Sequence, residues 1–189
     1  MTPPELYILR HGETEWNVEG RLQGHHDSPL TERGRAQAAQ QHRILASRDL
    51  AGFSFFLSPL GRCLQTAGIA LGGLATTARI DDRLMEISVG RWETRLRADL
   101  FAEGLIPDTD DAPEIYERAP GGEGFHALET RCRAFLADLE GPAVVVTHGI
   151  TSRMIRSLAL RRDPSALLEL AGGQGNVFHI RDGRSEELR

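Results

Sequence analysis

The sequence contains no lysine, so all 22 of its strongly basic side chains are arginines. It also has only two cysteines, Cys63 and Cys132, both in segments typical of helices. Two cysteines in such positions exclude a disulfide framework and a cysteine-based metal site, and a reducing compartment is the expected setting. The lack of lysine leaves arginine as the only strong cation that could hold an anion.

Long apolar runs are absent as well. No stretch approaches the ~18 apolar residues that a membrane helix needs, and residues 1–5 lack the basic start and apolar core of a secretory signal. The formal net charge of −5 gives no support for nucleic-acid binding. We therefore expect a cytoplasmic protein with no nucleic-acid partner and no membrane partner. Its oligomeric state, a monomer or a homodimer, stays open.

The remaining composition is that of an ordinary globular chain. The 189 residues are 40% hydrophobic and 26% charged, and they include no long low-complexity tract. This length suits one domain with a substantial core and is short for two. We expect a single domain over residues 1–189.

Apolar runs alternate with helical patterns along the chain. Strands are predicted at residues 6–9, 53–57, 76–80, 143–147 and 176–180. Helices are predicted at 32–45, 60–71, 125–139, 151–160 and 165–170, with Thr31 and Ser58 as N-caps. This alternation predicts a mostly parallel sheet with helices on both faces. Residues 95–120, which include an acidic run at 108–111, are predicted to form a helix and a surface insertion that covers the site as a lid.

The stretch from Leu6 to Asn17 carries the strongest chemical signal. An apolar run ends abruptly at Arg10 and His11, and Gly12 lets the backbone turn away. In open α/β sheets, ligands bind at the carboxyl ends of the strands. A guanidinium matches phosphate and a neutral imidazole offers a nucleophilic nitrogen, so the pair indicates attack on a phosphoryl group. The alternative is an ordinary strand-end pair that satisfies local hydrogen bonds.

Two further junctions carry polar side chains. Arg62 lies one turn into the helix after the second predicted strand, and His148 ends a buried strand. If these strands are parallel to the first, the two side chains converge with Arg10 and His11. Two arginines and a protonatable histidine could then surround a phosphoryl group in transfer without a metal. The N–H groups that open the helices after Ser58 and after His148 could add to this anion site.

The leaving group also needs a proton, and Glu86 is the candidate acid because it follows the third predicted strand. Nearby arginines would keep its carboxylate ionised, so burial or the incoming dianionic substrate must favour the protonated form. After a phosphohistidine forms on His11, the same carboxylate could take a proton from the hydrolytic water. Glu13 and Glu93 are rival acids, and a solvated loop carboxylate is another alternative. A metal site at the histidines or in the run 25–27 is weaker, because no HExxH spacing exists.

Short sequence blocks in a fixed order span nearly the whole chain. They are Arg10-His11-Gly12-Glu13-Thr14 with Trp16-Asn17, Gln23-Gly24, Asp27-Ser28-Pro29-Leu30-Thr31 with Gly34, Ser58-Pro59-Leu60-Gly61-Arg62-Cys63, Leu84-Met85-Glu86 with Trp92-Glu93, Pro120-Gly121-Gly122-Glu123, and Val146-Thr147-His148-Gly149. This series resembles the histidine phosphatase superfamily, the phosphoglycerate-mutase-like proteins. The resemblance implies a three-layer α/β/α sandwich, mostly parallel with one antiparallel edge strand, and no cofactor or metal.

The resemblance also implies roles for individual residues. His11 would be the phosphorylated nucleophile and Glu86 the proton donor and acceptor. Arg10, Arg62 and His148 would complete the phosphate pocket. The residues expected to bind the phosphate or to line its approach are Thr14, Asn17, Gln23, Gly24 and Gly149. The implied substrate is a small phosphorylated metabolite.

The residues after Glu86 indicate which branch of the family this chain resembles. Family mutases follow their catalytic glutamate with an arginine and a tyrosine, whereas this chain has Ile87 and Ser88. This pattern looks more like the small phosphatases, so we predict a metal-independent phosphomonoester hydrolase that acts through a phosphohistidine. The alternatives are a phosphoglycerate mutase and a non-catalytic module that binds a phospho-ligand or a protein. Thr94 and Gly124 depart from the glycine and the serine that are usual in the family at these positions.

Overall fold

The computed structural model describes residues 4–107 and 113–189, and within them six strands form one mixed sheet in the order β3-β2-β4-β1-β5-β6. The strands are β1 (Leu6–Arg10), β2 (Ser54–Leu57), β3 (Arg79–Ile80), β4 (Ala143–Thr147), β5 (Val177–Arg181) and β6 (Arg184–Leu188). The first four are parallel, and β5 and β6 form an antiparallel pair at one edge. The predicted mostly parallel sheet with an antiparallel edge is confirmed.

The central strand β1 is buried on both faces. Leu6 and Ile8 belong to the apolar cluster on one side of the sheet, and Tyr7 and Leu9 belong to the cluster on the other side. All four side chains are at most 5% exposed. Because successive side chains of a strand point to opposite faces, a strand covered on both sides needs apolar residues at every position. This burial explains the unbroken apolar run in the sequence.

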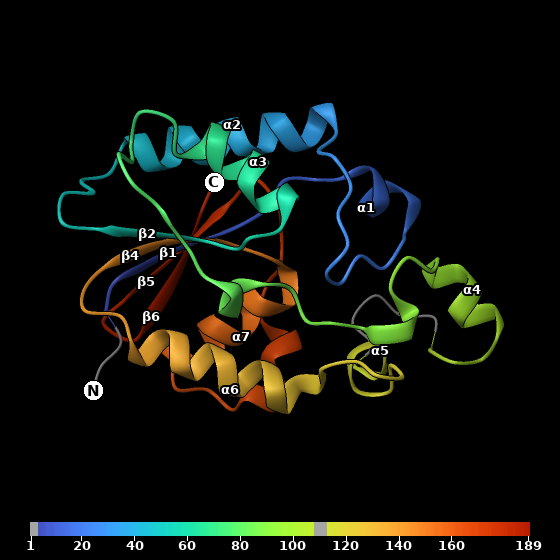
Figure 1. The fold of residues 1–189 in the computed structure, drawn as a ribbon. Helices are drawn as coiled ribbons and strands as arrows, with labels where there is room; N and C mark the ends of the chain where they lie inside the picture. Colours follow the sequence, from blue (N-terminus) through green and yellow to red (C-terminus); the bar gives the residue numbers. More distant parts are fainter. Residues whose placement is uncertain (1–3, 108–112) are drawn as a thin grey trace.

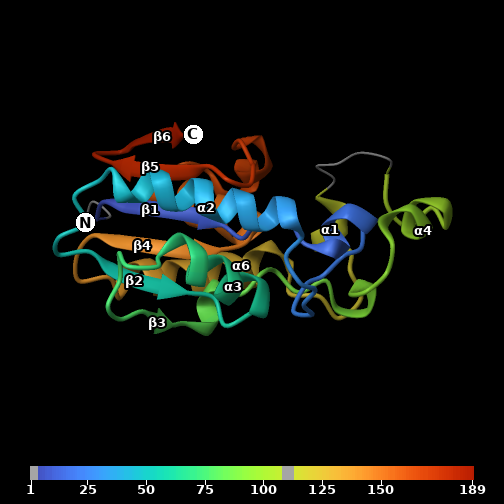
Figure 2. The same cartoon turned by 90° about the horizontal axis from the view of Figure 1, so that it is seen from above.

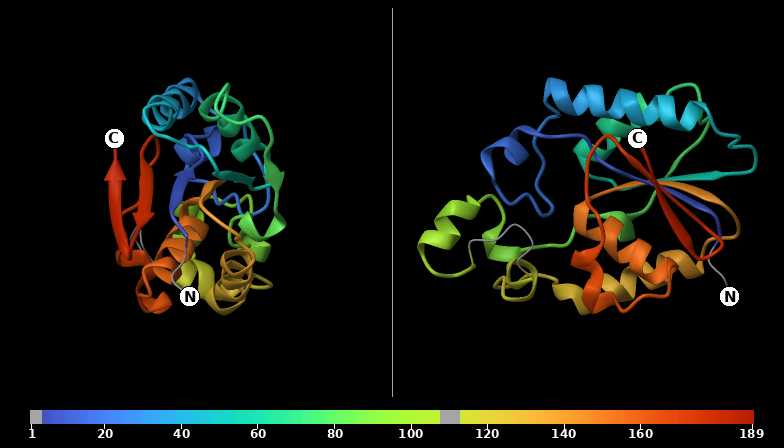
Figure 3. Two further views of the ribbon diagram at one scale, coloured as in Figure 1. Left: turned by 90° about the vertical axis from the view of Figure 1, so that its left-hand side faces the viewer. Right: turned by 180° about the vertical axis from the view of Figure 1, so that it is seen from behind.

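Helices cover both faces of the sheet, as Figures 1 and 3 show. On one face lie α2 (Glu32–Ala46) and α3 (Gly61–Ala70), and on the other lie α6 (Gly124–Ala137) and α7 (Gly149–Ala159). The side chain of Thr31 caps the start of α2, as predicted. This arrangement is the expected three-layer α/β/α sandwich.

Two details differ from the expectations. Ser58 does not cap the helix that follows it, because α3 begins at Gly61 and the Asp27 carboxylate accepts the Gly61 amide at 2.6 Å. Strand β6 is also absent from the predicted elements. This strand follows β5 through a two-residue turn at Asp182 and Gly183, where both residues have positive φ.

A group of short elements lies beyond the carboxyl ends of the parallel strands, as α1 and α4 show in Figure 2. Its helices are α1 (Glu15–Glu19), α4 (Arg97–Ala102) and α5 (Glu114–Glu117). Trp92 and Leu100 belong to a separate apolar cluster in this region. The predicted insertion at 95–120 belongs to this region, and its role as a lid stays a prediction. The acidic run at 108–111 and residues 1–3 lie outside the described residues.

Three short 3-10 helices complete the elements. They are η1 (Asp82–Leu84), η2 (Gly90–Trp92) and η3 (Pro164–Glu169). The last corresponds to the helix predicted at 165–170, and Asp163 caps it by accepting the Ser165 amide at 2.9 Å. No helix in the described part of the chain is both long and apolar enough to cross a membrane.

Candidate active site

The carboxyl ends of β1 and β4 bring two histidines together. Arg10 of β1 pairs in register with Thr147 of β4, and the His11 amide donates to the Thr147 carbonyl at 2.9 Å. His11 and His148 therefore follow neighbouring strands at the same level, and their ring centroids lie 5.3 Å apart. The convergence predicted from the strand ends is present.

The His11 ring is buried and neutral. Burial, followed by the charges of Arg10 and Arg62, lowers the pKa of His11 well below its usual value. Its Nδ1 lies 2.8 Å from the carbonyl oxygen of Gly12, which can only accept, so Nδ1 carries the proton. Nε2 then keeps its lone pair, which is the state that a nucleophile requires.

The backbone behind His11 is held by a close approach of two glycines. A Cβ on Gly12 would collide with the carbonyl of Gly34, and a Cβ on Gly34 would collide with the carbonyl of Glu13. The Gly12 amide also donates to Thr66 Oγ1 of α3 at 3.0 Å. Glycine at both positions therefore lets the start of α2 pack directly against the turn that carries the His11 ring.

The Arg62 side chain is only 1% exposed and is held by several acceptors. They are the carbonyls of His26 at 2.5 Å and Gly24 at 2.8 Å, Asp27 Oδ1 at 2.9 Å and His148 Nδ1 at 3.1 Å. These contacts use Nε, Nη1 and Nη2, so the guanidinium has one fixed orientation. It can present positive charge to a phosphate without reorganising.

His148 is fully buried between Arg62 and Ser58. Its Nδ1 accepts from Arg62 Nε at 3.1 Å, so the ring proton is on Nε2, which lies 2.7 Å from Ser58 Oγ. Burial, and next the charge of Arg62, lowers the pKa of His148 well below its usual value. Both ring nitrogens are thus engaged within the protein. Ser58, which the sequence predicts as a helix cap, orients this imidazole.

Arg10 has a buried donor that lacks an acceptor. Among the described residues, no hydrogen-bond partner meets its Nε. Burial lowers the pKa of Arg10, and the Glu86 carboxylate opposes this shift. Gly149 lies against the guanidinium, because a Cβ there would be 3.3 Å from Arg10 Cζ. A guanidinium with a buried, unused donor is suited to bind an anion.

The Glu86 carboxylate lies at the start of α7. It accepts hydrogen bonds from the Ile150 amide at 3.2 Å and from the amide and hydroxyl of Thr151, both at 3.0 Å. The first amides of α3 are likewise taken by Asp27. The prediction that these helix starts donate to phosphate is therefore wrong for these amides, since a carboxylate already accepts them.

The two rival acids are bound elsewhere. Glu13 accepts from Thr31 Oγ1 at 2.9 Å, and Glu93 accepts from Ser88 Oγ at 2.8 Å. Neither lines the two cavities at this edge of the sheet, whereas Glu86 lines both. Of the three candidate carboxylates, Glu86 is the one placed to meet a ligand.

The two cavities adjoin each other. The smaller has a volume of about 130 Å³, and His11 and Arg62 lie in its wall. The larger has a volume of about 300 Å³. Both are lined by Arg10, Asn17, Arg21, Leu22, Glu86 and Tyr116. A phosphoryl group in the smaller cavity would meet His11, and the rest of a substrate could extend into the larger one. His148 lines neither cavity.

The residues predicted to bind phosphate separate into two groups. Asn17, Gln23 and Gly24 line the smaller cavity, and Gly149 lines the larger one. Thr14 lines neither and is 0% exposed. Its Oγ1 accepts from the Asn17 amide at 3.2 Å, which caps α1, and from Gln23 Nε2 at 2.8 Å. In this structure Thr14 positions two lining residues and is not itself in the wall.

Residues 25–27, the alternative metal site, contact different partners and do not converge on one point. His25 Nε2 lies 2.9 Å from the Glu86 carbonyl oxygen, and Asp27 is bound to Arg62. In the described part of the chain, no group of three His, Cys, Asp or Glu side chains is arranged to hold a metal ion.

Several lining residues are not singled out by the sequence analysis. Tyr116 of α5 lines both cavities, and burial raises its pKa to about 12, so its hydroxyl stays a neutral donor. Ser152, Arg153 and Arg156 of α7 line the larger cavity. Their spacing after Gly149 is that of one helix face and could have indicated them. No comparable signal surrounds Tyr116.

An α/β/α sandwich with a neutral histidine beside Arg10 and the buried Arg62 at its carboxyl edge defines a class of enzyme that transfers phosphoryl groups. Comparison with known families agrees. The model of the histidine phosphatase superfamily (branch 1) matches residues 6–187, and the chain belongs to this superfamily. The family predicted from the sequence blocks is therefore confirmed.

Individual relatives fall within the same group. The chain is 38% identical over 157 residues to a probable phosphoglycerate mutase, GpmB, of Salmonella paratyphi C (strain RKS4594), covering 77% of this chain and 70% of the relative. The mycobacterial glucosyl-3-phosphoglycerate phosphatase Rv2419c complexed with VO3 has a TM-score of 0.83 at 27% identity, covering 97% of this chain and 96% of that one. A putative alpha-ribazole-5'-P phosphatase from Escherichia coli str. K-12 substr. MG1655 has a TM-score of 0.79 at 26% identity, with 98% and 94% covered.

Proposed function

We propose that this protein is a phosphomonoester hydrolase that passes the phosphoryl group through His11 without a metal ion. The observation that carries the proposal is the state of His11, a neutral ring with an unprotonated Nε2, in a residue that lines the smaller cavity. Arg10 and Arg62 in the same wall supply positive charge for the phosphate oxygens.

In the first step, the Nε2 lone pair of His11 attacks the phosphorus, and the bond from phosphorus to the alcohol oxygen breaks. Glu86 gives a proton to the departing oxygen, so a neutral alcohol leaves. Arg10 and Arg62 stabilise the charge on the equatorial oxygens. The products of this step are a phosphohistidine and a Glu86 carboxylate.

In the second step, a water molecule attacks the phosphorus and gives a proton to the Glu86 carboxylate. The bond from phosphorus to Nε2 breaks, inorganic phosphate leaves, and neutral His11 returns. The hydrogen bonds from the start of α7 hold the carboxylate in place for both steps. His148 acts from behind the cavity, because its contact with Arg62 orients that guanidinium.

The residues after Glu86 favour hydrolysis over a mutase reaction. Ile87 is 1% exposed and belongs to the apolar core, and Ser88 Oγ donates to Glu93. These positions therefore supply neither the guanidinium nor the phenol with which family mutases help to hold phosphoglycerate. A phosphoglycerate mutase is the second candidate function, because the relatives with the matching sequence carry that name.

A small phosphorylated metabolite fits the site as its substrate. The larger cavity, at about 300 Å³, is at the small end of the roughly 300–1,000 Å³ typical of small-molecule sites. The structural neighbours are named as phosphatases of such compounds. The absence of a nucleic-acid partner, the cytoplasmic setting and the homodimer stay predictions.

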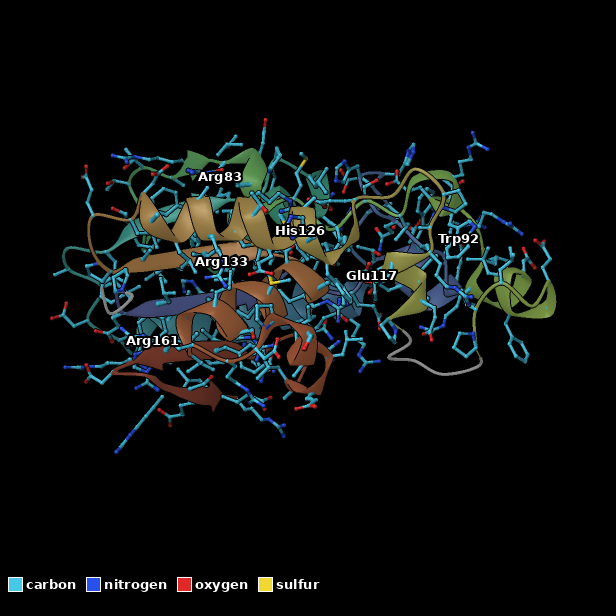
Figure 4. All side chains as sticks on the ribbon, turned by 90° about the horizontal axis from the view of Figure 1, so that it is seen from below. Arg83, Trp92, Glu117, His126, Arg133 and Arg161 are labelled. Atoms are coloured by element: carbon cyan, nitrogen blue, oxygen red, sulfur yellow. The ribbon has the colours of Figure 1, made fainter. Side chains whose placement is uncertain are left out.

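Phosphate release from a panel of phosphomonoesters, measured with a chelator present, tests the proposal. Wild type should release phosphate, and His11→Ala should lose nearly all turnover because no other histidine among the described residues lines either cavity. His126→Ala is the matched control, since Figure 4 shows His126 on α6 and this residue lines neither cavity.

Each result of the panel has a distinct meaning. Activity that a chelator abolishes would indicate a metallohydrolase, and full activity of His11→Ala would refute the phosphohistidine mechanism. Conversion of 3-phosphoglycerate to its isomer without phosphate release would indicate the mutase. Binding of phosphate compounds without any turnover would indicate the non-catalytic module.

A further inference from the structure

The part of the larger cavity's wall that the structure describes is rich in arginine. Five arginines line it: Arg10, Arg21, Arg97, Arg153 and Arg156. Among the described residues in its wall, Glu86 is the only carboxylate, and Glu86 already accepts hydrogen bonds from the start of α7. Arginine side chains in a cavity wall suit it to anionic ligands.

Two of the arginines come from one face of α7. Gly149, Ser152, Arg153 and Arg156 are spaced three and four residues apart, so they follow one another along the same side of the helix. Gly149 lies against Arg10, so this face starts at the phosphate site and leads away from it. The helix thus carries positive charge from the reacting group into the larger cavity.

The Arg156 side chain is held in place although no carboxylate among the described residues forms an ion pair with it. It is 3% exposed, its Nη2 donates to the Ala171 carbonyl at 2.6 Å, and its guanidinium carbon lies 3.7 Å from the centre of the Phe178 ring. Within the described chain, neither Arg156 Nε nor the buried Ser152 Oγ has a hydrogen-bond partner. These contacts fix the position of the guanidinium, and they leave donor capacity unused beside the cavity.

The surroundings of Arg156 make its positive charge costly. Burial, followed by the charge of Arg153, lowers the pKa of Arg156 to about 10. The acidic residue that acts on it is Glu187, and Glu187 is itself bound to Arg189 and Asn176. A buried charge without a close partner destabilises a protein, and an anionic ligand would remove this cost.

We propose that the larger cavity is a second anion subsite, in which Arg153 and Arg156 hold a carboxylate or a second phosphate of the substrate. The proposal rests on the proposed function, because the first phosphate must lie beside His11. The wall shared by the two cavities, which includes Arg10 and Tyr116, lets one small molecule reach both. The substrate class is therefore a phosphomonoester with another anionic group.

Binding to the His11→Ala protein tests this subsite without any need for turnover. Titration calorimetry compares 3-phosphoglycerate with glycerol 3-phosphate, which has a hydroxymethyl group in place of the carboxylate. A second pair, fructose 1,6-bisphosphate and fructose 6-phosphate, asks the same question for a second phosphate. In at least one pair, the compound with the additional anion should bind about tenfold more tightly or better.

Arginine variants made in the same His11→Ala protein locate the effect. Arg153→Gln and Arg156→Gln should each bring the two Kd values of the preferred pair together, and Arg156→Lys should keep part of the preference. Arg133→Gln is the matched control, because this arginine on α6 is exposed and lines neither cavity. Since Arg156 is buried, thermal unfolding of each variant shows whether it is folded, and Arg153→Gln gives an independent result.

The outcomes separate this inference from the proposed function. Equal binding within both pairs, or a preference that survives in both Gln variants, would overturn the second subsite, whether or not wild type hydrolyses phosphomonoesters. A preference that both variants remove supports the subsite even if wild type shows no hydrolysis. In that case only the proposed function would fail.

Discussion

The Asp27 carboxylate binds both the backbone amide and the guanidinium of Arg62. Its Oδ1 accepts from the Arg62 backbone amide at 3.2 Å and from Nη1 of the same residue at 2.9 Å. Its other oxygen accepts from the Gly61 amide at 2.6 Å, so one side chain caps α3 and orients the guanidinium. A loop residue from before α2 thus sets the position of an arginine in the phosphate cavity.

Asp27→Asn should lower kcat/KM by about tenfold, because hydrogen bonds to a charged group are worth roughly 1.5–3 kcal/mol and the amide keeps only part of them. Arg62→Ala removes the guanidinium itself and should cost about 10²-fold or more. Steady-state kinetics on a hydrolysed phosphomonoester measures both. Asp163→Asn is the control, since the Asp163 carboxylate also caps a short helix but accepts from Ser165 and not from Arg62. Equal kinetics for Asp27→Asn and wild type would show that Arg62 does not need this partner.

The sheet was largely predictable because its signal is local. The apolar runs of β1 and β4 reflect burial on both faces, and Thr31 caps α2 through its own neighbours in the sequence. Strand β6 is charged and mostly exposed, so it lacks an apolar pattern. Its signal was the Asp182-Gly183 pair, a dipeptide that favours tight hairpin turns because both positions need positive φ.

The part of the site that sheet topology determines could be predicted from the strand ends. His11 and His148 follow adjacent parallel strands, so their approach depends on topology alone. The capping of α3 by Asp27 depends on where a distant loop packs, and local sequence does not encode that position. The arginines of α7 were not predicted as site residues for a related reason. Their role depends on which face of the helix lines the cavity.

The buried histidines should make stability depend on pH. An unfolded histidine titrates near its ordinary pKa of 6.5, whereas His11 and His148 in the folded protein titrate well below it. Between these values the unfolded chain binds more protons, so stability rises with pH and is lost as pH falls below about 6.5. Each histidine should contribute about 1.4 kcal/mol per pH unit in this window.

Urea unfolding at several pH values from about 7 to about 5 measures this slope. Replacing one buried histidine, as in His148→Asn, should reduce the slope by about 1.4 kcal/mol per pH unit. His126→Asn is the control because its side chain is exposed on α6. If the slope is the same in His148→Asn and wild type, His148 is not kept neutral by its surroundings.

Thr94 has a backbone conformation that suits glycine. Its φ is 68°, in the left-handed region, which is unfavourable for a β-branched residue. The Thr94 amide donates to the Leu22 carbonyl at 2.7 Å, and Arg21 donates to the Thr94 carbonyl at 2.6 Å, so the loop is held in this state. Gly124, where the family usually has serine, has a φ of 70°. The threonine at position 94 therefore adds backbone strain, whereas the glycine at position 124 avoids it.

Thr94→Gly should stabilise the protein by about 1 kcal/mol and raise Tm by about 2–4 °C, because the relief of strain exceeds the greater freedom of glycine in the unfolded chain. Thermal unfolding measures the change. Thr130→Gly, within the regular helix α6, should have the opposite sign and lower stability by about 0.3 kcal/mol, because glycine is a poorer helix former than threonine. A lower Tm for Thr94→Gly would mean that the contacts of the Thr94 side chain stabilise the protein by more than its positive φ destabilises it.

Glu86 has two proposed roles, and a change of leaving group separates them. Glu86→Gln keeps the size of the side chain and an oxygen that can accept from Ile150 or Thr151, but it has no acidic proton to give. An alkyl phosphate needs that proton when its alcohol leaves, whereas p-nitrophenyl phosphate releases a stable phenolate. The second step needs the carboxylate as a base for either substrate.

In rapid-mixing experiments, the first step of Glu86→Gln with an alkyl phosphate should therefore slow by about 10²–10⁴-fold, the range expected for general acid catalysis. With p-nitrophenyl phosphate the first step should change little while the second slows, so phosphohistidine accumulates and the phenolate appears as a burst of about one equivalent per enzyme. Glu93→Gln, a rival carboxylate outside both cavities, should behave as wild type. Equal losses for the two substrates with no burst would mean that Glu86 stabilises the site without moving a proton, because only proton transfer depends on the basicity of the leaving group.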